Sequence, residues 1–116
     1  MALPPVDLLR GSLDLLILRA LLVQPTHGFG VARWIEQATD DALRIEEGSL
    51  YPALYRLEKR GWIGSEWGLS DNNRRARFYR LTPKGRAQLR VEVEGFRRFA
   101  EAVFKALEAA SSPVEA

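Results

Sequence analysis

The 116-residue sequence predicts a single, mainly α-helical domain of the α+β class, in which helices precede a β hairpin and a long final helix. Three observations predict it. Residues 8–22 and 28–38 carry apolar side chains at helical spacing, residues 75–81 alternate as a strand does, and residues 83–110 repeat apolar residues at intervals of four and three. Apolar residues make up 47% of the chain, which is enough for one modest core.

The first expected helix, residues 8–22, is apolar nearly all the way round, which indicates burial against more than one neighbour. It contains Asp14 and Arg19 and is too short to span a bilayer, so neither a membrane span nor a signal peptide is expected. Pro25 breaks this helix, and a second helix is expected over residues 28–38.

A third helix is expected over residues 49–60. Because proline is tolerated in the first turn of a helix, Pro52 places the helix start close to Gly48 or Ser49, with Ser49 as the N-cap. Gly61 is expected to end it. At about 100° per residue, one face is apolar and faces the core through Leu50, Leu54 and Leu57. The opposite arc carries Tyr51, Pro52, Tyr55, Arg56 and Lys59.

Two strands are expected next, at residues 62–67 and 75–81, joined by a linker rich in turn formers at 68–74. Thr82 and Pro83 then form an N-cap with proline at the first helical position. They open a helix that is expected to reach about Ala110. The domain prediction is therefore a folded domain over residues 1–82, a helix over 83–110 and a tail over 111–116.

The charge is concentrated in one part of the chain. Between Arg56 and Arg90 there are ten basic and three acidic residues, which gives +7, whereas the remaining seven basic and twelve acidic residues give −5. A fold that gathers the basic segment on one face would present a surface suited to a polyanion. A solvated charged face is the plainer alternative, but the tyrosines among the bases and the hairpin favour binding.

A helix followed by a basic β hairpin can place the helix in a DNA major groove and the hairpin on the flanking phosphates. We therefore predict a winged helix-turn-helix fold with a two-stranded β wing. Hydroxyl and amide groups on Ser49, Tyr51, Tyr55, Asn72 and Asn73 could meet phosphates or base edges. The same fold also serves modules that bind only protein, which is the alternative function.

Several motifs together resemble the PadR family of bacterial transcriptional regulators: LLRGSLDLLILRAL from residue 8, HGFG at 27–30, EEGSLYPALYRLEKRGWI from residue 46 and NNRRARFYRLTPKGR from residue 72. The resemblance covers roughly residues 8–110 and fits the small subtype with a single C-terminal dimerisation helix. It implies a dimeric, cytoplasmic repressor. It also implicates, in DNA binding, Ser49, Tyr51, Tyr55, Arg56 and Lys59 in the helix and Asn73, Arg74, Arg75 and Arg77 in the wing.

The last helix carries an apolar seam with the 4-3 spacing of a coiled coil. The seam consists of Leu89, Val93, Phe96, Ala100, Val103, Leu107 and Ala110. A long helix with its own seam needs a partner, so a homodimer is expected. In some members of the resembled family a small aromatic effector releases DNA, and a tryptophan of the dimerisation helix lines the effector site. Phe96 stands at that position here, and interface packing is its plainer role.

No cofactor or metal is expected, because the chain has one histidine and no cysteine. His27 is expected to cap a helix locally, and Tyr79 is expected in the core. Glu46 and Glu47 are adjacent and diverge by about 100° on a helix, so they cannot flank one substrate atom. No nucleophile–base pair or phosphate loop is recognisable, and an enzyme is not expected.

Overall fold

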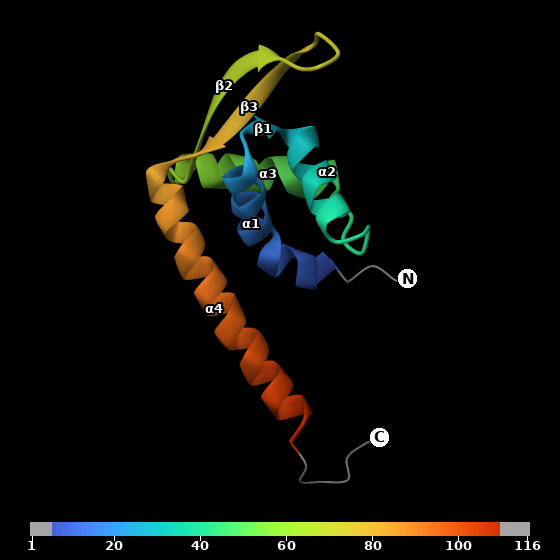
Figure 1. Ribbon diagram of the computed structural model, residues 1–116, viewed down its shortest axis with the longest axis vertical. Coiled ribbons are helices and arrows are strands. Elements are labelled where there is room, and N and C mark those ends of the chain that lie inside the picture. Colours follow the sequence, from blue (N-terminus) through green and yellow to red (C-terminus); the bar gives the residue numbers. More distant parts are fainter. Residues whose placement is uncertain (1–5, 110–116) are drawn as a thin grey trace.

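The computed structural model describes residues 6–109, and their side chains from residue 12 onward. The structure consists of four helices and a small sheet. The β hairpin and the last helix project from the body that the other elements form (Figure 1). The elements in chain order are α1 (Val6–Val23), β1 (Thr26–His27), α2 (Gly28–Ala38), α3 (Glu47–Lys59), β2 (Ile63–Leu69), β3 (Arg75–Leu81) and α4 (Pro83–Leu107). The predicted mainly α, winged-helix class is confirmed. The expected tail at 111–116 and Ala110 lie outside the described residues.

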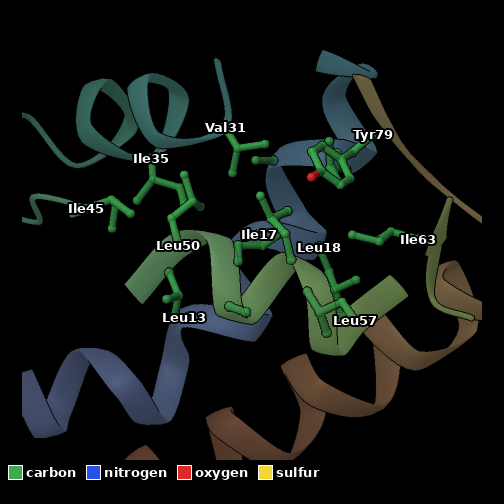
Figure 2. Packing of buried hydrophobic residues seen from close by; sticks show 14 of the residues in the cluster. Leu13, Ile17, Leu18, Val31, Ile35, Ile45, Leu50, Leu57, Ile63 and Tyr79 are labelled. Carbon is green, nitrogen blue, oxygen red and sulfur yellow. The ribbon is translucent and has the colours of Figure 1, made fainter. Parts of the chain in front are cut away.

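The core is built around α1, which contacts α2, α3, α4 and β3. Ile17 and Leu18 of α1 are fully buried, as the all-round apolar pattern of this helix predicts. Figure 2 shows them between the apolar side of α3 and the Tyr79 ring of β3. Tyr79 is 7% exposed and belongs to the core, as expected. The central position of α1 therefore fixes where α3 and the hairpin lie.

The sheet has three strands in the order β1-β3-β2 and is antiparallel throughout. The predicted two-stranded wing is present as β2 and β3, and β1 adds a two-residue strand that pairs Thr26 with Tyr79 and His27 with Phe78. A strand of two residues is too short to show an alternating pattern, so no sequence pattern indicates it. This third strand joins the α1–α2 connection to the base of the wing.

The predicted start of α3 is wrong. The helix begins at Glu47 with Glu46 as N-cap, and Ser49 lies inside the first turn, donating its backbone N–H to the Glu46 carbonyl at 3.0 Å. Pro52 therefore sits beyond the first turn. In a regular helix, the backbone N–H of residue 52 would donate a hydrogen bond to the Gly48 carbonyl, but proline has no N–H. Gly48 is exposed, so water can donate to its carbonyl instead. The rule that places proline in the first turn thus put the expected helix start one or two residues too late and the expected N-cap three residues too late.

The end of α3 follows the prediction closely. Gly61 has φ +78°, and its N–H donates to the Glu58 carbonyl while the Trp62 N–H donates to the Leu57 carbonyl. This pair of bonds is a Schellman motif, which needs the left-handed backbone that glycine adopts at no cost. The predicted caps of the other helices are also present: His27 Nδ1 accepts from the Gly30 N–H and Thr82 Oγ1 accepts from the Gly85 N–H, both at 3.0 Å.

Two glycines in α4 differ sharply in their surroundings. A Cβ on Gly85 would lie 1.8 Å from the Trp62 carbonyl oxygen, whereas a Cβ on Gly95 would meet nothing within 4 Å. We expect Gly85→Ala to lower the free energy of unfolding by about 1–3 kcal/mol, because backbone must move. Gly95→Ala should raise it by about 0.5–1 kcal/mol, since alanine favours a helix over glycine. Urea unfolding of the two variants measures both effects, and equal shifts would contradict the α4–Trp62 packing.

Candidate nucleic-acid interface

The two faces of α3 are sharply different. Leu50, Leu54 and Leu57 are buried against the core, whereas Tyr51 and Tyr55 are 45% and 64% exposed. The Lys59 ammonium lies 5.4 Å from the centre of the Tyr55 ring, so the lysine and the tyrosine share the outer face. The tyrosines reach solvent because the leucines occupy the core.

A groove of about 920 Å³ lies between the N-terminal end of α2, the outer side of α3 and the wing. Its aromatic and basic lining residues are His27, Phe29, Arg33, Tyr51, Trp67, Arg74, Arg75, Arg77 and Tyr79. Among the lining residues that the structure describes, Asp71 is the one acid. The fold thus gathers part of the basic segment along one groove, as the charge distribution predicted.

The tip of the wing is a tight, exposed turn. Ser70 N–H donates to the Arg74 carbonyl at 2.8 Å, and Asn73 has φ +61°, a left-handed conformation that asparagine tolerates. Neither Arg74 nor Arg75 has an ion pair with another described residue. Their guanidinium groups are therefore available to an external anion.

Arg77 differs from these two arginines. Its Nε donates to Ser65 Oγ at 2.9 Å, Ser65 Oγ donates to Glu58 Oε2 at 2.6 Å, and Arg77 Nη2 lies 3.6 Å from the same Glu58 oxygen. These contacts link both wing strands to α3. Through these contacts, Arg77 helps to set the angle between the wing and α3. Burial also raises the pKa of the neighbouring Tyr79 hydroxyl, and the charge of Arg77 partly opposes that rise.

Arg56 also makes a contact within the protein. Its Nη2 donates to Asp14 Oδ1 of α1 at 2.9 Å. The angular position of Arg56 on α3 lies on the opposite flank from Tyr51 and Tyr55, and the structure brings it to α1 rather than to the groove. Ser49 is half-buried in the first turn of α3. Of the predicted helix residues, Tyr51, Tyr55 and Lys59 thus share one exposed surface.

Sequence reasoning missed two exposed aromatic residues in the groove. Trp67 is 55% exposed, and Phe29 is 63% exposed with the Arg33 guanidinium 5.8 Å from its ring centre. From the sequence, Phe29 and Trp67 are expected only as parts of a helix and a strand. The sequence places Trp67 in a strand of a hairpin whose other strand carries arginines, which is the closest indication of a role in the groove. Only the strand register shows which arginines it contacts.

The predicted seam on α4 divides into two parts. Leu89 is buried and Val93 is partly buried against the core of the chain. Beyond them the seam is exposed, with Phe96 at 48%, Val103 at 38% and Leu107 at 74%. Figure 1 shows this part of α4 running away from the other helices. The described residues of the chain therefore leave much of this length of seam open to solvent.

Within residues 6–109, no cluster of three or more histidine or acidic side chains could hold a metal ion. No helix among these residues is long and apolar enough to cross a membrane.

An exposed helix face beside a basic wing is typical of winged-helix proteins that bind nucleic acid. Comparison with known proteins identifies the family. Residues 17–91 match the model of the transcriptional regulator PadR-like family. The chain is 38% identical over 81 residues to the transcriptional regulator Rv3488 of Mycobacterium tuberculosis, covering 69% of this chain and 71% of that protein.

Solved structures agree with this match. A transcriptional regulator from Clostridium thermocellum is 32% identical with a TM-score of 0.78, over 85% of this chain and 96% of that one. A PadR family transcriptional regulator from Eggerthella lenta is 31% identical with a TM-score of 0.75, over 90% of this chain and 88% of that one. The chain belongs to the PadR-like family of transcriptional regulators. Its family and these relatives are regulators, not enzymes, as predicted.

The orientation of Tyr51 depends on Gly28. A Cβ at position 28 would lie 2.7 Å from the Tyr51 hydroxyl oxygen and 2.8 Å from a ring carbon, so the ring would have to tilt. We expect Gly28→Ala to move the Tyr51 ring at a cost below about 1.5 kcal/mol, because a partly exposed side chain gives way more easily than backbone. The cost should vanish in a Tyr51→Ala background.

Urea unfolding of the four proteins in this double-mutant cycle, with the ring signals of Tyr51 followed by NMR, measures both effects. Gly48→Ala is the matched control, because a Cβ at position 48 meets nothing within 4 Å. Unchanged Tyr51 signals in Gly28→Ala would contradict the contact.

Proposed function

We propose that the protein is a sequence-specific DNA-binding repressor that acts as a homodimer in the cytoplasm. One observation carries the proposal: Tyr51 and Tyr55 are exposed on α3, and the wing beside them carries Arg74 and Arg75, which have no ion pair with another described residue. In this arrangement α3 enters the major groove, and Arg74, Arg75 and Asn73 of the wing meet the adjoining phosphates. Lys59 extends the contact along α3, whereas Ser49 is half-buried on the flank that carries Arg56, and Arg56 and Arg77 hold α3 in place as well as adding positive charge.

The exposed part of α4 supports the dimer. Phe96, Val103 and Leu107 project from one side of the helix, and Phe99 and Phe104, 66% and 59% exposed, widen the apolar face. An apolar face of this extent on a helix favours burial against a second helix. A twofold pair would place the two copies of α3 in successive major grooves, about 34–36 Å apart on a pseudo-palindromic operator.

Salt dependence tests DNA binding directly. If the dimer neutralises about six to ten phosphates, its affinity for an operator duplex should fall about 10³–10⁵-fold between about 50 and 200 mM salt. The operator is first selected from genomic fragments at low salt, and fluorescence anisotropy then gives the affinity at each salt concentration. A random duplex of equal length is the control. Failure to shift any fragment at low salt would contradict DNA binding.

Dimerisation is tested on α4. Phe96→Asp should raise the dissociation constant of the dimer at least about tenfold, because association would bury an unpaired charge. Val91→Asp is the matched control: Val91 is 62% exposed on the same helix but lies on the side opposite the seam. Sedimentation velocity across a concentration series measures both variants. Monomeric wild-type protein, or equal effects of the two substitutions, would contradict the proposed interface.

An effector site is proposed at the same interface, where Phe96 offers an aromatic face between the two subunits. An effector would act through a difference in affinity between DNA-binding and released arrangements of the dimer. Operator affinity that stays constant during titration with flat aromatic compounds would contradict this part of the proposal.

A further inference from the structure

Trp67 occupies an unusual position on the wing. It lies on β2 directly opposite Arg77 of β3, and Arg75 is its diagonal neighbour on the same face of the sheet. The guanidinium carbons of Arg75 and Arg77 lie 4.7 and 5.5 Å from the Trp67 ring. The ring nevertheless remains 55% exposed. An exposed indole thus holds two positive charges beside it.

The ring has a physical effect on these two arginines. Arg75 and Arg77 are two residues apart on one strand, so their side chains share a face and their charges repel each other. The negative face of the indole attracts both guanidinium groups and offsets part of that repulsion. Arg77 is also held by Ser65 and Glu58. Among the described residues, Arg75 has no ion pair, and the Trp67 ring is the one aromatic group beside its guanidinium. Trp67 therefore pre-orders the arginine that is otherwise free.

The direction that this cluster faces is also informative. Trp67, Arg75 and Arg77 line the groove on the wing side, and Tyr51 and Phe29 line it from α3 and α2. The face of the wing that carries Tyr79 into the core continues outward as the face that carries Trp67. A DNA strand that follows the groove beside α3 would consequently pass over the indole.

We propose that Trp67, Arg75 and Arg77 form a binding site for the sugar–phosphate backbone of DNA, in which the indole covers a deoxyribose and holds the two guanidinium groups toward the flanking phosphates. This inference rests on the proposed DNA-binding function and adds to it the residue that organises the wing. A contact to sugar and phosphate carries no base information, so the site raises affinity for every sequence alike.

The first experiment compares Trp67→Leu, Trp67→Phe and wild type on an operator duplex and a random duplex. We expect Trp67→Leu to weaken binding to both duplexes about 5- to 20-fold, since two cation–π contacts are lost. For this variant, the slope of log affinity against log salt concentration should be smaller in magnitude by about 1–2, because each dimer would make fewer ordered phosphate contacts. Trp67→Phe should retain most of the affinity, since it keeps an aromatic face.

Leu69→Ala is the matched control. Leu69 is 65% exposed on the same strand and the same face, but it has no ring to hold an arginine. Its affinity and salt dependence should match the wild type. An equal loss in Leu69→Ala and Trp67→Leu, or a wild-type salt slope in Trp67→Leu, would overturn the proposal. Wild-type protein that binds no duplex would instead refute the proposed function itself.

The second experiment tests contact with the ring. A Trp34→Phe, Trp62→Phe double variant leaves Trp67 as the single tryptophan of the chain. Acrylamide, which is uncharged, should quench its fluorescence freely in the absence of DNA and much less when a saturating duplex covers the ring. Circular dichroism checks that the variant is folded. Equal quenching with and without bound duplex would show that DNA does not cover the indole and would overturn the proposal.

Discussion

The packing of α3 against α1 is the constraint on which the rest of the structure depends. Leu50, Leu54 and Leu57 of α3 belong to the same buried cluster as Ile17 and Leu18 of α1. A rotation of α3 about its axis would expose the leucines and bury tyrosine hydroxyls without partners, and both changes cost free energy. The hydrophobic core therefore determines which residues α3 exposes on its outer face.

Polar contacts between elements then set the angle of α3 to α1 and of the wing to α3, which apolar packing alone leaves adjustable. The Arg56–Asp14 pair joins α3 to α1, and the chain from Arg77 through Ser65 to Glu58 joins the wing to α3. Such half-exposed pairs contribute about 0–1 kcal/mol each to stability, so orientation is their more important effect. Because α4 contacts α1 and adds Leu89 and Val93 to the core, the same helix α1 connects the exposed apolar face of α4 to the outer face of α3. Both surfaces are therefore anchored on one shared core.

Much of the fold could be predicted because its signals are local. The Schellman end of α3 at Gly61, the Thr82–Pro83 cap and the alternation of residues 75–81 each depend on a few neighbouring residues. The differences between the predicted and observed elements also have local causes. The observed helix α3 begins earlier than predicted, because Pro52 can lie beyond the first turn where water donates to the Gly48 carbonyl. The strand β1 was missed because two residues show no period.

The candidate site was predictable only in part. The sequence determined the two faces of α3, the basic segment and the apolar seam of α4, because residue type and helical period are sufficient to define them. The tertiary structure decided which arginines are free and which are engaged. Arg56 meets an aspartate 42 positions earlier in the chain, and the register of β2 and β3 sets Trp67 against Arg75 and Arg77. Contacts between distant segments depend on how the elements pack, and no local pattern in the chain encodes them.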